Sequence, residues 1–183
     1  MLGRAAPAWP RVFPRALIPV TCPKKETMNQ PLKTSRIAVV SSSWHRDIVQ
    51  RATRSLVAEL VQNQIPADQI HEFEVPGAFE IPLQALRLAQ SGRYDAIVAC
   101  GLVVDGGIYR HDFVASAVID GLMRVQLDTR VPVLSVVLTP KEFHEHEVHL
   151  RFFEEHLVHK GVEAAQACVR TLANQKALAS LKN

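Results

Sequence analysis

Short apolar runs recur along the chain, separated by longer segments with a helical repeat. Four of these runs are compact and rich in β-branched residues, which is typical of strands. They cover residues 36–43, 70–75, 95–101 and 131–138. The run over 95–101 is apolar almost throughout, as expected for a strand that is buried on both faces of a sheet.

The segments after these runs place apolar residues on one helical stripe. In the first of them, Ile48, Ala52 and Leu56 recur every four residues. The pattern predicts helices over 47–64, 79–92 and 111–129, and from about 141 to the end of the chain. We expect the last helix to be interrupted near Gly161, because glycine weakens a helix interior.

Strand and helix thus alternate four times with short connections. This order predicts an α/β fold, a flavodoxin-like doubly wound sheet of four parallel strands with helices on both faces. Ligands of such sheets bind beyond the carboxyl ends of the strands. These ends are expected at residues 42–44, 75–77, 101–107 and 138–140. The sequence has neither GxGxxG nor GxxxxGK[ST], the motifs of dinucleotide-binding and P-loop proteins.

The length of 183 residues suits one domain with a tail. We expect residues 1–30 to form a disordered extension and residues 31–183 to form the domain. The extension is rich in proline and arginine and has no steady period. An organelle transit peptide and a start codon placed before the true start, with Met28 as that start, are the alternatives.

Charge and cysteine content narrow the class of protein. The net charge is +3, but residues 1–27 carry +4 and the remainder −1, so a nucleic-acid partner is not expected. No apolar run approaches the ~20 residues of a membrane span, so no membrane partner is expected. The three cysteines Cys22, Cys100 and Cys168 are scattered, which favours free thiols and a cytoplasmic location.

Two loops carry candidate chemistry. The stretch VPGAFEIP, residues 75–82, offers Ala78, Phe79 and Glu80 to a polar ligand where a helix begins. The alternative is a simple connection in which Glu80 favours the helix dipole. The stretch VDGGIYRH, residues 104–111, places two glycines and Arg110 before a helix, which suits a phosphate. The alternative is a loop with a solvated arginine.

Aromatic and histidine residues add further candidates. Trp44 follows the first strand and either stacks on a flat heterocycle or covers the sheet edge. Five histidines lie between Lys141 and Lys160, but HExxH does not occur there. We therefore expect solvated histidines and no metal site. Among them, His149 is a candidate for closing over a phosphate.

With these motifs placed, the chain from about Arg36 to Ala173 resembles the lumazine synthase family of riboflavin biosynthesis. The resemblance rests on four stretches: VPGAFEIP; YDAIVACGLVVDGG followed by HDFVASAVIDGL; VPVLSVVLTP; and HKGVEAA. The family joins 5-amino-6-ribitylaminouracil to 3,4-dihydroxybutanone 4-phosphate, giving 6,7-dimethyl-8-ribityllumazine and phosphate. The resemblance implies an enzyme, a transferase, that uses no metal or redox cofactor. It also implies pentamers with active sites between neighbouring subunits.

The resemblance assigns roles by position. It places the pyrimidine ring against Trp44 and the phosphate of the butanone at a loop of the third strand. Ala78, Phe79 and Glu80 meet the ribityl chain and ring, Leu102, Val103 and Val104 line the pocket, and Gly107 and Ile108 cradle the phosphate.

Several positions depart from the common pattern of the family. Arg110 stands where a proton-shuttling histidine is usual, and His111 follows one residue later. Ser135 replaces an aromatic residue in the fourth strand, and His149 replaces an arginine that grips phosphate. These changes together resemble the type II variant of the family, which assembles as paired pentamers.

These departures lead to a mechanistic expectation and to two other functions. We expect Arg110 to be the catalytic residue, stabilising the departing phosphate by charge, because its pKa is too high for proton transfer. His111 is the reserve candidate. The alternatives are a flavin or lumazine carrier that has lost turnover, and a flavodoxin-like oxidoreductase, which is disfavoured because an obvious Ser/Thr cluster for a flavin phosphate is missing.

Overall fold

The computed structural model describes residues 32–104, 110–140 and 147–181, with the backbone alone over 147–154. Eight main elements follow one another in these ranges. They are β1 (Ile37–Ser42), α1 (Arg46–Gln62), β2 (Ile70–Val75), α2 (Ile81–Gln90), β3 (Ala96–Leu102), α3 (His111–Thr129), β4 (Val133–Leu138) and α4 (Glu147–Ser180). Short 3-10 turns at Ala67–Gln69 and Ala78–Glu80 precede β2 and α2.

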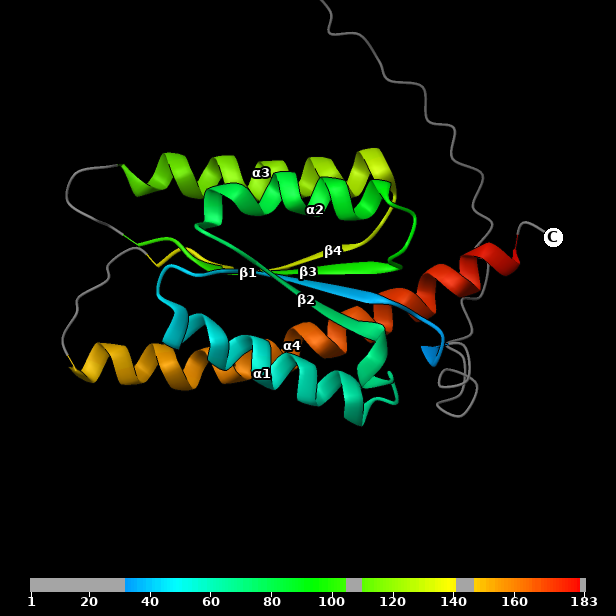
Figure 1. Ribbon diagram of the computed structural model, residues 1–183, viewed down its shortest axis with the longest axis horizontal. Coiled ribbons are helices and arrows are strands. Elements are labelled where there is room, and N and C mark those ends of the chain that lie inside the picture. The colour runs from blue at the N-terminus through cyan, green and yellow to red at the C-terminus, as the bar shows by residue number, and fades with distance from the viewer. Residues whose placement is uncertain (1–31, 105–109, 141–146, 182–183) are drawn as a thin grey trace, which may run out of the picture.

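The four strands form one parallel sheet in the order β2-β1-β3-β4. Helices α1 and α4 cover one face and α2 and α3 the other, as Figure 1 shows. The predicted α/β doubly wound fold is therefore confirmed. The chain moves outward from β1 to β2 and then returns past β1 to β3. The order reverses between β1 and β3, and ligands of such sheets bind outside this point.

Each face of the sheet has its own hydrophobic core. Along β1, Ile37 and Val39 pack toward α1 and α4, whereas Ala38 and Val40 pack toward α2 and α3. This alternation follows from the two-residue period of a strand. All seven residues of β3 are buried, because this strand lies between two neighbours and under helices on both sides. This burial on both faces explains why the sequence of β3 is almost entirely apolar.

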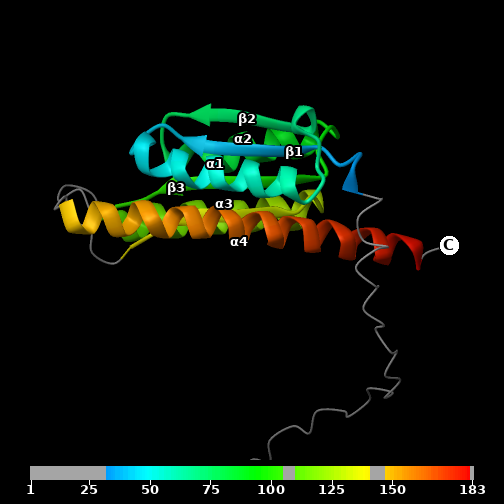
Figure 2. The same ribbon diagram turned by 90° about the horizontal axis from the view of Figure 1, so that it is seen from below.

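The predicted interruption of the last helix near Gly161 is wrong. Helix α4 runs without a break from Glu147 to Ser180, along the side of α1, as Figure 2 shows. A Cβ atom at Gly161 would lie 2.1 Å from Ser55 Oγ and 2.3 Å from the carbonyl oxygen of Ala52. The glycine therefore allows α4 to approach α1 closely. The residue itself stays helical because the helix continues on both sides of it.

The predicted start of the last helix, at about residue 141, lies outside the described residues, and the other boundaries lie within three residues of the prediction. Helix α3 begins and ends where the periodicity placed it. The helix expected over 79–92 begins as a 3-10 turn, carries Pro82 in its first turn, and stops before Gly92, whose φ is +66°. No helix within the described ranges is long and apolar enough to cross a membrane. The expected extension, residues 1–30, lies outside the described residues.

Candidate functional site

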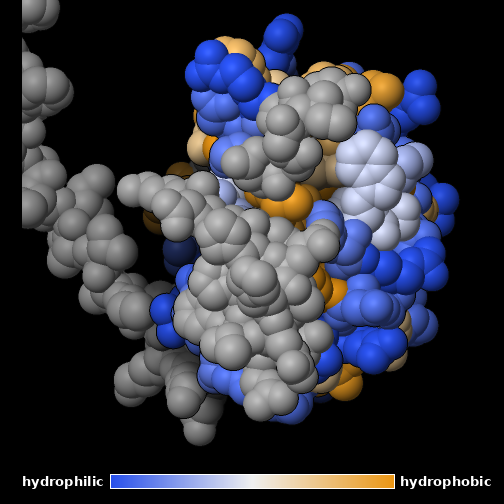
Figure 3. Space-filling view, turned by 90° about the vertical axis from the view of Figure 1, so that its left-hand side faces the viewer, coloured by the Kyte–Doolittle hydropathy of each residue, from blue (hydrophilic) through white to orange (hydrophobic). Residues whose placement is uncertain are grey.

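A crevice of about 490 Å³ opens at the carboxyl edge of the sheet, beside the point where the strand order reverses. Its volume is within the usual range for a small-molecule site. Figure 3 views this end of the molecule, where hydrophobic surface appears among hydrophilic residues. The crevice is lined by Trp44, His45, Ala78, Phe79, Glu80, Leu102, Val103, Val104, His111 and Val114.

Backbone hydrogen bonds to the end of β2 hold the turn that carries Trp44. The N–H of Ser43 donates to the carbonyl of Val75 over 2.8 Å, and the N–H of Trp44 donates to the carbonyl of Pro76 over 3.1 Å. The hydroxyl of Ser43 also donates to the Pro76 carbonyl, over 3.0 Å. The side chain of Trp44 is 67% exposed. The indole is therefore open both to solvent and to a ligand of the crevice.

His45 follows in a left-handed backbone conformation, with φ 56° and ψ 40°. This conformation is uncommon for a residue with a side chain and is found at functional sites more often than elsewhere. The carbonyl of His45 accepts the N–H groups of Ile48 and Val49, each over 3.0 Å, at the start of α1. The sharp turn at His45 thus directs the chain from Trp44 into the helix.

The second loop places a carboxylate beside the indole. The N–H of Gly77 donates to Glu80 Oε2 over 2.8 Å, which fixes this carboxylate at the start of α2. Ala78 is buried and Phe79 is exposed beside it. A negative side chain in the first turn of a helix is also favoured by the helix dipole. Glu80 therefore caps the short 3-10 turn that leads into α2 while it faces the crevice.

The end of β3 forms the floor. Leu102 and Val103 are buried, and the N–H of Val103 donates to the carbonyl of Leu138 over 2.9 Å. Their backbone groups lie at the carboxyl edge, where polar groups of a ligand are usually recognised in such sheets. The floor is therefore apolar in its side chains, with main-chain donors and acceptors near its rim.

The start of α3 separates the two candidate residues of the third loop. His111 lines the crevice, whereas Arg110 is not among the lining residues. The side chain of Arg110 is 71% exposed. Its guanidinium lies 4.2 Å from the centre of the Phe113 ring and pairs with Asp112 over 3.1 Å. His111, the second of the two candidates, is thus the one that lines the crevice.

The structure brings together seven residues predicted from the sequence: Trp44, Ala78, Phe79, Glu80, Leu102, Val103 and Val104. Ser135 is exposed on the edge strand β4 and does not line the crevice. Gly107 and Ile108 lie outside the described residues, and His149 lies where only the backbone is described. His45 and Val114 were missed as lining residues, although each is next to a predicted loop or helix start.

The cysteine thiols of the core are not part of this site. Burial raises the pKa of Cys100 and Cys168 to about 12, with the nearby Glu72 carboxylate adding to the effect at Cys100. Both are free thiols. Within the described ranges, no three His, Cys, Asp or Glu side chains are grouped so that they could hold a metal ion.

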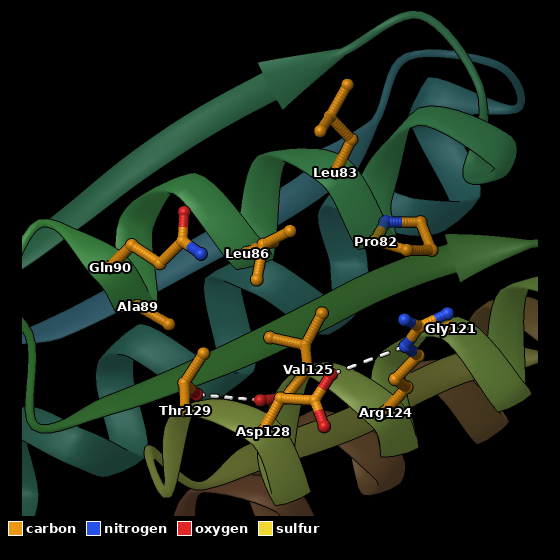
Figure 4. A pocket seen from close by; sticks show the side chains of 10 residues that line it. All are labelled: Pro82, Leu83, Leu86, Ala89, Gln90, Gly121, Arg124, Val125, Asp128 and Thr129. Atoms are coloured by element: carbon orange, nitrogen blue, oxygen red, sulfur yellow. Dashed lines mark hydrogen bonds and ion pairs between the residues drawn. The ribbon is translucent and has the colours of Figure 1, made fainter.

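A second hollow of about 660 Å³ lies between α2 and α3, away from the carboxyl edge. Figure 4 shows side chains of both helices around it, with the ion pair of Arg124 and Asp128 on α3. At Gly121 the helices approach so closely that a Cβ atom would lie 2.9 Å from Pro82 Cβ. Leu83 lines this hollow and is exposed, and Met123 and Leu127 are other exposed apolar residues of α3.

Comparison with known proteins identifies relatives along most of the chain. A family model described as 6,7-dimethyl-8-ribityllumazine synthase matches residues 34–176. A 6,7-dimethyl-8-ribityllumazine synthase of Rhodococcus erythropolis is 61% identical over 147 residues, which cover 80% of this chain and 95% of the relative. Two proteins named 6,7-dimethyl-8-ribityllumazine synthase 2 are also similar. That of Pseudomonas syringae pv. tomato is 52% identical, covering 80% and 86% of the two chains. That of Bradyrhizobium diazoefficiens is 56% identical, covering 76% and 84%.

Proposed function

The chain belongs to the 6,7-dimethyl-8-ribityllumazine synthase family, and from this premise we propose that the crevice at the carboxyl edge holds the two substrates of that reaction. The reaction condenses 5-amino-6-ribitylaminouracil with 3,4-dihydroxybutanone 4-phosphate and releases phosphate. The observation that carries the placement is the convergence of Trp44, the Ala78–Glu80 turn and the end of β3 on one cavity. The enzyme is a transferase of riboflavin biosynthesis.

A carrier that has lost turnover finds no support in the relatives. The three similar proteins named above are all called synthases. The crevice also contains residues of the kinds that the reaction needs, an aromatic surface, a carboxylate and a histidine. We therefore retain catalysis as the function.

The uracil ring is proposed to lie against Trp44. An exposed indole fixed at its backbone offers a flat surface to a heterocycle at small entropic cost. The carboxylate of Glu80, held by the Gly77 N–H, accepts hydrogen bonds from ribityl hydroxyls or ring N–H groups. Main-chain groups of Leu102–Val104 read the polar edge of the ring. Trp44→Ala should therefore raise KM for the uracil strongly.

The phosphate of the butanone is proposed to bind at the start of α3. There the helix N-terminus carries partial positive charge and Arg110 adds a full charge. Gly107 and Ile108 precede this helix in the sequence. Ser135 and His149 remain proposed substrate contacts, as parts of a site shared between neighbouring subunits.

The chemistry starts when the ring amine attacks the ketone. The imine forms with loss of water, phosphate leaves by β-elimination, and ring closure then expels the second water. Alignment of two reactants supplies on the order of 7–11 kcal/mol, so much of the acceleration needs no proton donor. We propose that Arg110 stabilises the leaving phosphate and that His111, which lines the crevice, assists proton transfer.

Turnover is tested by mixing both substrates with the purified chain and following formation of the lumazine by absorbance. Product formation is the expected result. A protein that binds riboflavin or the lumazine tightly but forms no product contradicts the synthase and favours the carrier.

Two variants test the division of roles at α3. Arg110→Gln should raise KM for the phosphorylated ketone by roughly tenfold or more and leave KM for the uracil unchanged, since a hydrogen bond to a charged group contributes about 1.5–3 kcal/mol. Arg110→Lys, which keeps the charge, should restore part of the loss. His111→Ala should lower kcat by on the order of 10²-fold and change its pH profile. Equal effects of Arg110→Gln on both KM values contradict the phosphate role.

A homo-oligomer built from pentamers, and specifically a pair of pentamers, is proposed as the assembly. The exposed apolar side chains of α2 and α3 support a subunit interface on that face.

A cytoplasmic location is also proposed, and the two free thiols of the core are consistent with a reducing compartment. Cell fractionation with an antibody to the chain tests the location.

A further inference from the structure

Gly77 has an ordinary backbone conformation, with φ −129° and ψ 175°. Any residue can adopt these extended angles, so the glycine is not needed for the turn itself. The reason for a glycine here must therefore be the space that a side chain would take.

A side chain at this position would meet two groups of the crevice at once. A Cβ atom on Gly77 would lie 3.0 Å from Cε3 and 3.0 Å from Cζ3 of Trp44, both in the six-membered ring of the indole. It would also lie 3.0 Å from Glu80 Oε2. Contacts this short require each neighbour to move by a few tenths of an ångström. The bare backbone of Gly77 is thus the surface against which the indole rests.

The indole ring has more freedom to move than the backbone that carries it. The backbone of Ser43 and Trp44 is held to Val75 and Pro76 by hydrogen bonds, so the turn carrying the ring cannot easily shift. Trp44 is 67% exposed, so the ring has room to move, and a Cβ atom on Gly77 would push it away from the glycine. Such a movement changes the crevice and leaves the core intact.

We propose that Gly77 is a positioning residue, whose missing side chain sets the place of the Trp44 ring and its separation from the Glu80 carboxylate. This inference rests on the proposed function, because it assumes that the uracil lies between these two groups. A larger residue would push the Trp44 ring and the Glu80 carboxylate away from position 77 and so change the distance between them. The uracil would then lose either its stacking surface or its hydrogen bonds.

A double-mutant cycle between Gly77 and Trp44 tests the proposal. Gly77→Ala should raise KM for the uracil by roughly tenfold, since misplacements near 1 Å cost about 10²-fold in rate and this one is smaller. The KM for the phosphorylated ketone should not change. In a Trp44→Phe background, where the fused ring is missing, the same substitution should have less than half of that effect in free-energy terms. Equal effects in both backgrounds overturn the proposal.

Fluorescence of Trp44 tests the geometry without substrate. Trp9 and Trp44 are the two tryptophans of the sequence, so a Trp9→Phe background isolates the signal of Trp44. Gly77→Ala should increase quenching of that signal by acrylamide, because the ring is pushed away from the backbone against which it rests. Unchanged quenching contradicts the proposed contact even if catalysis falls.

Gly92→Ala is the matched control. Gly92 has φ +66° and no atoms near its Cβ position, so alanine there strains the backbone away from the crevice. It should lower the melting temperature without changing either KM. Trp44→Ala separates the two claims: if it leaves KM for the uracil unchanged, the proposed ring site fails, and if it raises KM while the cycle shows no coupling, the role of Gly77 alone fails.

Discussion

Glu80 combines a structural and a binding role in one carboxylate. Its Oε2 accepts the N–H of Gly77 over 2.8 Å at the start of α2, and the same side chain lines the crevice. Glutamine can accept the same hydrogen bond but carries no charge. The pair of substitutions Glu80→Gln and Glu80→Ala therefore separates the hydrogen bond from the charge.

We expect Glu80→Gln to keep stability within about 0.5 kcal/mol of the parent and Glu80→Ala to lose about 1 kcal/mol, the usual cost of removing a helix cap. Both should raise KM for the uracil. Urea denaturation and steady-state kinetics measure the two effects. If the two variants are equally stable, the bond to Gly77 does not support the helix.

The core thiols give a second prediction for single residues. Burial raises the pKa of Cys100 and Cys168 to about 12, so almost none of either thiol is ionised at neutral pH. The thiolate is the reactive form. In the folded protein neither should react with Ellman's reagent, and both should react after unfolding in guanidinium. A Cys22→Ser background removes the remaining cysteine of the sequence. Fast reaction of the folded variant contradicts the burial of these thiols.

The contact between α1 and α4 depends on Gly161. An alanine there would place its Cβ 2.3 Å from the backbone oxygen of Ala52. In an ordinary helix interior, glycine to alanine stabilises by about 1 kcal/mol. Here we expect Gly161→Ala to destabilise by roughly 1–3 kcal/mol, as overpacking does, so the sign itself is informative.

Chemical denaturation checks this sign. Ser55→Ala is the control, because it removes the hydroxyl that a Cβ atom at Gly161 would meet but leaves the carbonyl of Ala52 in place. The loss caused by Gly161→Ala should therefore persist in the Ser55→Ala background. A Gly161→Ala protein that is more stable than the parent would show that the helices do not meet closely there.

Gly161 also shows what could not be predicted from sequence patterns. Apolar patterns located the four strands and four main helices of the described residues. The helices show a period of 3.6 residues, and the strands are short apolar runs that are continuous where both faces are buried. These patterns could not tell a glycine that breaks a helix from one that lets another helix approach, since that depends on a partner far away in sequence. The same limit applies to Arg110 and His111. Arg110 has an extended backbone just before α3, so a helical angle could not tell which of the two side chains lines the crevice.

The crevice itself was largely predictable. Its residues follow the carboxyl ends of β1, β2 and β3, and those ends meet at one edge in any parallel sheet. The contact of Trp44 with Gly77 was not predictable, because it depends on how two loops lie relative to each other. Neither residue has a sequence signal that specifies the other.

At the scale of the whole molecule, α3 leaves apolar side chains uncovered. Phe113, Met123 and Leu127 are exposed on α3, and Leu83 is exposed on α2, the neighbouring helix. Where such side chains form a patch, the patch commonly marks a contact with another protein. An interface between subunits would remove this surface from water, at about 25 cal/mol for each Å² of apolar area buried.

Charged substitutions on this face test the proposed assembly. Leu127 is 69% exposed in the single chain, so Leu127→Glu should fold normally by circular dichroism yet give a smaller species in sedimentation velocity. Turnover should fall with the assembly if neighbouring subunits share each site. Leu178→Glu is the matched control, since Leu178 is 60% exposed near the end of α4, on the opposite face of the sheet. It should leave particle size unchanged. An unchanged particle for Leu127→Glu, or an equal effect of Leu178→Glu, would place the interface on another surface.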